Sequence, residues 1–67
     1  MNKSDLKKIE EGSYIYDGID GYEVTRIYTS GVQYYHKWET DYGKFKFGKF
    51  YFVSYEELLE DYWELVE

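Results

Sequence analysis

Residues 54–67 read SYEELLEDYWELVE, and this stretch decides the fold that we expect. Ser54 stands at the N-cap position, and Glu57 three residues later completes the sequence pattern of a capping box. Val53 and Leu58 occupy the two positions of a hydrophobic staple. Apolar side chains then recur at three- and four-residue steps, the period of one helix face: Tyr55, Leu58, Leu59, Tyr62, Leu65 and Val66. The sequence therefore predicts an amphipathic helix over residues 54–67.

The opposite face of this predicted helix carries only acidic side chains: Glu56, Glu57, Glu60, Asp61, Glu64 and Glu67. These six acids, without one lysine or arginine among them, equal the net charge of the whole chain, −6. Like charges four residues apart cost about 0.2–0.5 kcal/mol per pair. A sequence selected only for solubility intersperses lysines, so the acidic face indicates a binding surface. A merely solvated face is the alternative.

Length and composition predict a single domain over residues 1–67 with an aromatic core. The chain has no cysteine, hence no disulfide and no thiolate metal site, while 10 Tyr, 4 Phe and 2 Trp make up 24% of it. The longest apolar run, residues 50–53, is far shorter than the roughly 20 residues of a membrane span. Residues 1–5 lack the apolar run of a signal peptide. We therefore expect a cytoplasmic protein that does not bind membranes.

Two strand-like runs, residues 22–29 and 32–40, flank Ser30-Gly31, which has the composition of a two-residue hairpin loop. That loop pairs Thr29 with Val32 and predicts one face suited to a core. Its members are Glu23, Thr25, Ile27, Thr29, Val32, Tyr34, His36 and Trp38. The other face holds Arg26, Tyr28, Tyr35, Lys37 and Glu39.

A third run, residues 44–53, changes its alternation halfway. Phe45 and Phe47 alternate with lysines, and then Phe50 and Phe52 take over with the opposite parity. A β-bulge at Gly48-Lys49 restores one face, because the extra residue turns the following side chains over. All four phenylalanines are then expected on the core face.

These elements predict an α+β fold: an antiparallel meander of three or four strands with the C-terminal helix packed on one face. A short N-terminal helix, capped by Ser4 and stopped by Gly12, precedes a strand at residues 14–16. The predicted core joins two sets of side chains. The sheet contributes Tyr34, Trp38, Phe45, Phe47, Phe50 and Phe52, and the helix contributes Leu58, Leu59, Tyr62 and Leu65.

The sequence offers little for catalysis or metal binding. His36 is the single histidine, so with no cysteine it cannot assemble a nucleophile–base pair or a usual zinc shell. Asp17, Asp20 and Glu23 lack the spacing of a calcium loop, and the first two are explained as turn residues. We expect no cofactor, no metal and no enzymatic activity.

The tyrosines indicate a second contact surface. Ten tyrosines are too many for so small a core, because each buried hydroxyl needs a hydrogen-bond partner. Tyr28, Tyr35 and Tyr51 fall on the sheet face away from the predicted core. Exposed tyrosines supply rigid, amphipathic contact area, which is typical of binding surfaces.

Residues 44–52 favour an alternative, because single-strand binders combine basic residues with aromatic rings that stack on bases. The run Lys46–Phe52 resembles the aromatic signature strand of RNA-recognition and cold-shock domains, although it lacks their second glycine. The strand order before the helix is also similar to that of the arm-binding domains of phage integrases. These resemblances imply a small nucleic-acid-binding or structural domain that uses the Lys44–Phe52 strand.

The acidic balance favours the first hypothesis, since an acidic protein is repelled by nucleic acid and attracted to basic clefts. We expect a phage or mobile-element inhibitor, a monomer or small homo-oligomer, whose helix carboxylates mimic nucleic-acid phosphates. Its partner is then a basic nucleic-acid-binding protein of the host, such as a CRISPR effector, a restriction enzyme or a glycosylase. In this hypothesis Glu56, Glu57, Glu60, Asp61, Glu64 and Glu67 form the first contact surface, and Tyr28, Tyr35 and Tyr51 form the second.

Overall fold

A computed structural model describes the backbone of residues 1–39 and 45–66, with the side chains of residues 1–36 and 49–66. It confirms the α+β class, with two short helices and five strands. The elements in chain order are α1 (Lys3–Leu6), β1 (Tyr14–Tyr16), β2 (Gly21–Ile27), β3 (Gly31–Glu39), β4 (Phe45–Ser54), α2 (Tyr55–Glu60) and β5 (Glu64–Val66). The predicted side chains Trp38, Phe45 and Phe47 lie outside the described set, as does Glu67.

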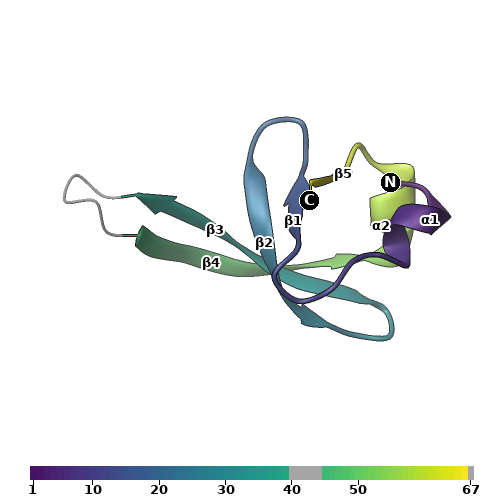
Figure 1. Cartoon of the computed structure of the whole chain (residues 1–67), viewed down its shortest axis with the longest axis horizontal. Coiled ribbons are helices and arrows are strands. Elements are labelled where there is room, and N and C mark those ends of the chain that lie inside the picture. Colours follow the sequence, from purple (N-terminus) through teal and green to yellow (C-terminus); the bar gives the residue numbers. More distant parts are fainter. Residues whose placement is uncertain (40–44, 67) are drawn as a thin grey trace.

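The five strands form one antiparallel sheet in the order β4-β3-β2-β1-β5. The first four strands are a meander, and β5 returns to pair with β1 through Ile15 and Leu65. The sheet is strongly twisted, so that the long β3–β4 hairpin extends away from the body formed by the other elements (Figure 1). The molecule is accordingly elongated, 39 Å along its longest axis and 17 Å along its shortest.

The N-cap of α2 is confirmed. The side chain of Ser54 accepts a hydrogen bond from the backbone N–H of Glu57 at 3.2 Å, and its hydroxyl donates to Glu57 Oε1 at 3.3 Å. Val53 and Leu58, the predicted staple, are both buried in the same core cluster. The local signals at the start of this segment were therefore sufficient to place the helix start.

The predicted length of this helix is wrong, because α2 ends at Glu60 and residues 64–66 form β5. The acidic first turn suits a helix start, but the last turn contains no basic residue to offset the dipole. Acidic groups four residues apart also repel one another in any longer helix. Pairing with β1 instead places the partly buried Leu65 opposite Ile15, and this packing favours the strand over a longer helix.

The β2–β3 hairpin forms, but its predicted register is wrong. Tyr28 N–H donates to Gly31 O at 2.8 Å, so the two-residue loop is Thr29-Ser30 instead of Ser30-Gly31. A further register shift lies between Val24 and Arg26. Val24 consequently stands beside Tyr34, and Ile27 is exposed.

The predicted β-bulge in β4 is confirmed. Between the pairs Tyr35–Phe50 and Lys37–Phe47, two steps along β3 match three steps along β4, so the extra residue lies at 48–49. The expected burial of the following phenylalanines is wrong, because Phe50 pairs with Tyr35 on the face opposite Tyr34. Phe50 is 60% exposed and Phe52 is 52% exposed.

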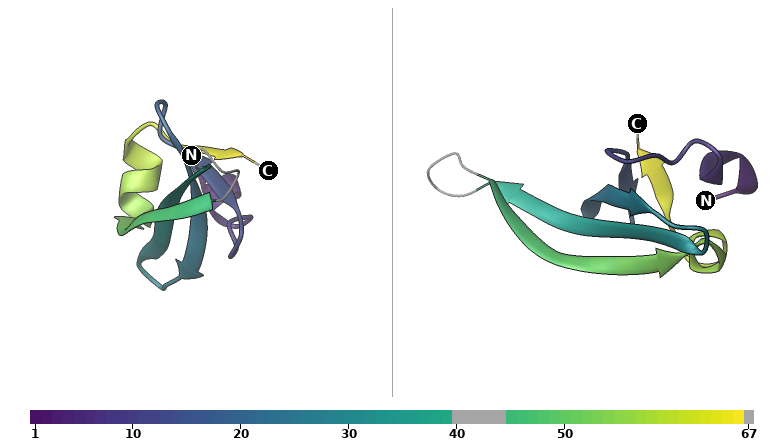
Figure 2. Two further views of the ribbon diagram at one scale, coloured as in Figure 1. Left: turned by 90° about the vertical axis from the view of Figure 1, so that its left-hand side faces the viewer. Right: turned by 90° about the horizontal axis from the view of Figure 1, so that it is seen from below.

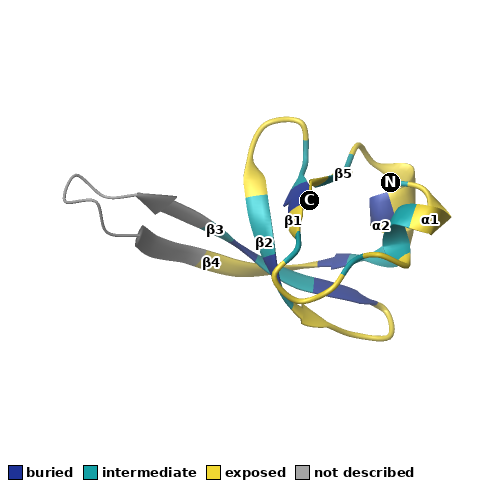
Figure 3. Ribbon diagram, in the orientation of Figure 1, coloured by how far each residue is buried: buried dark blue, intermediate teal, exposed yellow. Residues whose placement is uncertain are grey.

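The core is aliphatic at its centre and aromatic at its margin. Its buried centre consists of Ile15, Val24, Val32, Val53 and Leu58, where the sheet meets α2 (Figure 3). The side chains packed around it include Met1, Leu6, Ile9, Tyr22, Tyr34, Tyr55, Trp63 and Leu65. Of the residues predicted for the helix side, Leu58 and Leu65 belong here, whereas Leu59 and Tyr62 are exposed.

The N-terminal segment packs beside α2 (Figure 2). Helix α1 is capped by Asn2 and not by Ser4, since Asn2 Oδ1 accepts from Asp5 N at 2.8 Å while Asp5 Oδ2 accepts from Asn2 N at 3.2 Å. The Met1 amine donates to the carbonyl oxygens of Leu58 and Trp63, both at 2.8 Å. These bonds hold the N-terminus against α2 and against the residue that precedes β5.

Candidate partner-binding surface

The acidic side chains of the C-terminal segment are divided between two elements. Glu56, Glu57 and Glu60 lie on α2, Asp61 caps its C-terminus, and Glu64 lies on β5. All five side chains are exposed, as a partner-binding role requires. The predicted single row along one helix does not exist, because the chain leaves the helix after Glu60.

A second source of negative charge, which sequence reasoning assigned only to turns, lies beside this segment. Asp17 and Asp20 belong to the β1–β2 turn, where Asp17 Oδ1 accepts from Ile19 N and Asp20 N, both at 2.8 Å. These backbone hydrogen bonds, that from Asp20 first, lower the pKa of Asp17. A Cβ placed on Gly18 in this turn would lie 3.2 Å from Cδ1 of Tyr62. The turn and the C-terminal segment are therefore in contact.

We call this combined region the acidic surface and define it as Asp17, Asp20, Glu56, Glu57, Glu60 and Asp61. Burial first, and then Asp17 and Glu57 among other charges, raise the pKa of Tyr34, so both carboxylates act on one aromatic side chain. The acidic surface is thus assembled from α2 and the β1–β2 turn. The Asp-Gly dipeptides at 17–18 and 20–21 predict a turn, but only the tertiary fold places that turn against Tyr62, close to the end of α2.

An aromatic cluster connects the acidic surface to the sheet. Tyr34 lies at its centre, with ring-centroid distances of 4.8 Å to Tyr22, 5.5 Å to Trp63 and 5.5 Å to Tyr51. Tyr51 is stacked on Tyr34 and exposed, so it borders the acidic surface on the α2 side. The prediction that Tyr51 shares a face with Tyr28 and Tyr35 is wrong, because Tyr51 pairs with Tyr34 in the ladder.

Alkaline titration should reveal this cluster. Burial, followed by the 3.1 Å hydrogen bond that Tyr22 donates to Asp17 Oδ2, raises the pKa of Tyr22 from 10.0 to about 12. A phenol that binds its proton more tightly when folded adds stability below its unfolded pKa. That contribution is lost as the pH rises from about 10 to about 12. We expect circular dichroism to show unfolding in this window.

The control for this titration is Tyr22→Phe, which removes the group with the raised pKa. Tyrosinate absorbance of the wild type should show a late fraction that coincides with unfolding, and the variant should lose part of that fraction. Ionisation of every tyrosine before any loss of folded signal would contradict the prediction.

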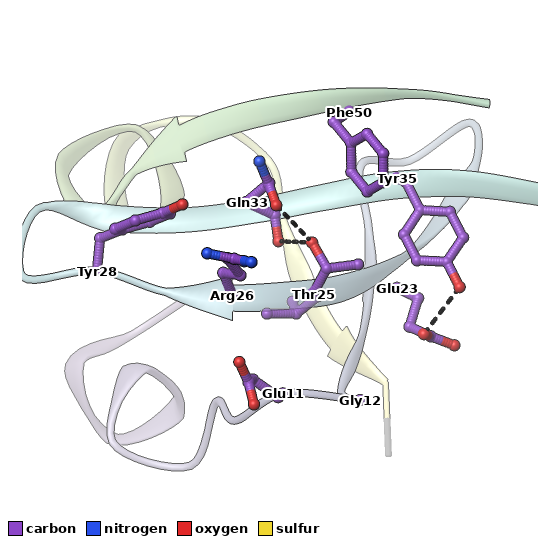
Figure 4. Close-up of a pocket in the computed structure, with 10 residues that line it drawn as sticks. Glu11, Gly12, Glu23, Thr25, Arg26, Tyr28, Gln33, Tyr35 and Phe50 are labelled. Atoms are coloured by element: carbon purple, nitrogen blue, oxygen red, sulfur yellow. Dashed lines mark hydrogen bonds between the residues drawn. The ribbon is translucent and has the colours of Figure 1, made fainter. Parts of the chain in front are cut away.

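The sheet face away from α2 carries a groove (Figure 4). Part of its polar lining is internally bonded: the single hydroxyl hydrogen of Thr25 is shared between Gln33 O, at 3.2 Å, and Gln33 Oε1, at 3.1 Å. Tyr35 donates its hydroxyl to Glu23 Oε2 at 2.9 Å and is only 5% exposed, so its prediction as an exposed contact residue is wrong. Tyr28 is exposed, as predicted.

His36 is packed against Tyr22, with ring centroids 5.5 Å apart. Across the described residues, the structure has no group of three or more His, Asp or Glu side chains placed to hold a metal ion. None of the helices in that part of the chain has the length and apolar character needed to cross a membrane.

Comparison with known protein families, with curated proteins and with solved structures found no match to this chain.

Proposed function

We propose that this chain is a non-enzymatic protein-binding inhibitor whose acidic surface takes the place of nucleic-acid phosphates in a basic cleft. The observation that carries this proposal is the exposure of the α2 carboxylates together with the approach of the Asp17–Asp20 turn to Tyr62, two residues after the end of α2. A cleft that binds phosphates presents lysine and arginine side chains, which attract such a group of carboxylates.

The distribution of charge along the chain supports the same function. Residues 37–49 contain Lys37, Lys44, Lys46 and Lys49 against Glu39 and Asp41, which gives +2. Since the total is −6, the rest of the chain carries −8. This uneven distribution of charge turns the negatively charged part of the protein toward a basic partner as the two approach. Such steering accelerates association at low salt.

The partner in this proposal is a nucleic-acid-binding protein of a bacterial host, and the inhibitor is encoded by a phage or mobile element. CRISPR effectors, restriction enzymes and base-excising glycosylases all hold nucleic acid in basic channels. One of the predicted residues, Tyr35, drops out of the proposed contact because it is buried. Glu64 stays a candidate contact, since it is exposed on β5 and pairs with Tyr16, next to the Asp17–Asp20 turn.

The test compares two double variants with the same change in charge. Glu60→Gln with Asp61→Asn neutralises part of the acidic surface, and Glu10→Gln with Glu11→Gln neutralises two exposed acids elsewhere. Proteins captured from a bacterial lysate are identified by mass spectrometry, and their association rates are then measured. We expect the first variant to slow association about 10-fold at low salt, and the second to change it little. Equal rates for both variants would contradict the proposal.

A second candidate, single-stranded nucleic-acid binding along β4, gains support from one observation. Phe50 and Phe52 are exposed beside Lys49 instead of buried, so their rings are accessible for stacking on bases. A gel shift with single-stranded and duplex DNA and RNA at low salt separates the two functions. Salt-sensitive binding favours this candidate, whereas the phosphate mimic should bind none of them.

A further inference from the structure

Strand β4 is the edge of the sheet and carries apolar side chains that nothing in the described structure covers. Its single neighbour is β3. Four consecutive residues, 49–52, are exposed, and three of them are aromatic. A long edge strand with unpaired backbone groups and exposed apolar side chains is a template for pairing with another strand.

Hydrogen-bonded and non-bonded pairs alternate along the β3–β4 ladder, and this alternation shows which backbone groups of β4 point away from β3. Tyr55 N–H donates to Ser30 O at 3.1 Å, and the ladder continues from this pair as Gly31–Ser54 and Val32–Val53. Hydrogen-bonded pairs alternate with non-bonded pairs in an antiparallel ladder. The backbone of Tyr51 therefore bonds to β3, whereas the N–H and C=O groups of Phe50 and Phe52 point to the free edge.

We propose that two copies of this chain pair along their β4 edges, antiparallel, about a two-fold axis at Tyr51. In this register the outward N–H and C=O groups of Phe50 bond to those of the partner's Phe52, and those of Phe52 bond to the partner's Phe50. The four bonds join two five-stranded sheets into one continuous sheet. Such an interface uses the same surface of both copies, as a two-fold axis requires.

The side chains suit this register on both faces of the sheet. Directly opposite residues of an antiparallel pair share a face, so Phe50 of each copy lies against the partner's Phe52. Tyr28, whose ring centroid is 6.0 Å from that of Phe52, borders the resulting group of four phenylalanines. On the α2 side, each Tyr51 lies beside the partner's Tyr51. The exposed aromatic side chains of residues 50–52 all become contacts.

Charge complementarity indicates that the strand pairing with β4 is the β4 of a second copy of this chain. It also favours the antiparallel direction for that pair. Lys46 and Lys49 precede the two-fold axis on β4, whereas Glu56 and Glu57 follow it at the start of α2. Antiparallel pairing directs the basic half of each β4 toward the acidic α2 of the partner. A parallel arrangement would place like charges side by side, which is destabilising.

A single cysteine tests the register, because the chain contains none of its own. In the proposed dimer, Tyr51 of one chain and Tyr51 of the other form a non-hydrogen-bonded pair. Their Cα atoms are then about 4.5 Å apart, a separation that a disulfide can bridge. We expect Tyr51→Cys to form a disulfide-linked dimer under mild oxidation. Ile19→Cys, at an exposed site on the β1–β2 turn, should remain largely monomeric. Equal cross-linking of the two variants would overturn the proposal.

Two substitutions at one position test the backbone bonds. Phe52→Ala removes the ring but keeps the outward N–H, and Phe52→Pro removes both without breaking the β3–β4 ladder. Sedimentation velocity of the wild type should show a dimer that weakens with salt. The dissociation constant should rise with alanine and at least about 10-fold further with proline, with circular dichroism unchanged. A wild type that stays monomeric at millimolar concentration, or equal effects of the two variants, would overturn the proposal.

Discussion

Replacing Leu58 with alanine should bring the protein to the edge of unfolding, at a cost of about 2–5 kcal/mol in the free energy of unfolding. Leu58 has an exposed fraction of 0% and belongs to the buried cluster formed with Val53 and Val32. Truncation leaves a cavity that the rigid sheet cannot close. Small domains have total stabilities of about 5–15 kcal/mol, so this loss is a large share. Urea denaturation followed by circular dichroism measures it.

The adjacent residue is the matched control. Leu59 was predicted for the core but is 38% exposed, so Leu59→Ala should cost less than about 1 kcal/mol. Both substitutions remove the same atoms from the same helix and differ little in helix propensity. Equal denaturation midpoints for the two variants would contradict the buried face that the structure assigns to α2.

Gly31→Ala should lower the free energy of unfolding by a similar amount, because it adds an atom where there is no space instead of leaving a cavity. Gly31 begins β3, and a Cβ at this position would press on the carbonyl oxygen of Val53 and lie 2.7 Å from Cα of Ser54. Both obstacles are backbone atoms of β4, so no side-chain rotation relieves them. Overpacking costs about 1–3 kcal/mol, and we expect about 3 kcal/mol here, because the strands must separate. A thermal melt would show the loss as a lower midpoint.

Gly21→Ala provides the comparison within the same sheet. The nearest atom to a Cβ at Gly21 is the carbonyl oxygen of Ile15, at 4.0 Å, so the substitution meets open space. It should leave the melting temperature nearly unchanged or raise it slightly, since alanine reduces the freedom of the unfolded chain. A Gly31→Ala protein as stable as Gly21→Ala would contradict the close approach of β3 and β4.

The sequence was informative wherever a signal was local. The cap at Ser54, the bulge at 48–49 and the existence of the β2–β3 hairpin each depend on a few adjacent residues, and each is confirmed. The prediction that failed was the register in which β2 pairs with β3. Moving the hairpin loop to Thr29-Ser30 and adding a shift after Val24 changed which side chains share a face. A one-residue slip exchanges the two faces of a strand.

The candidate site was predicted only in part, because it depends on tertiary contacts. The exposure of the α2 carboxylates followed from the amphipathic pattern, and their exposure in the structure agrees. The contribution of Asp17 could not be predicted, since it requires the β1–β2 turn to touch Tyr62. The end of α2 could not be predicted from the sequence either, because residues 64–66 pair with β1, which is far away in the sequence.

The pairing of β1 with β5 has a consequence for how the chain acquires its fold. The β2–β3 and β3–β4 hairpins join neighbouring segments, so they can form early. The pairing of β1 with β5 instead joins residues as far apart in the sequence as Tyr14 and Val66. Closing so long a loop is entropically costly, and contacts of large sequence separation slow folding. During synthesis, β1 therefore keeps an unpaired edge until β5 has left the ribosome. Ile15, the residue at the centre of that strand, is among the last of the core to be enclosed.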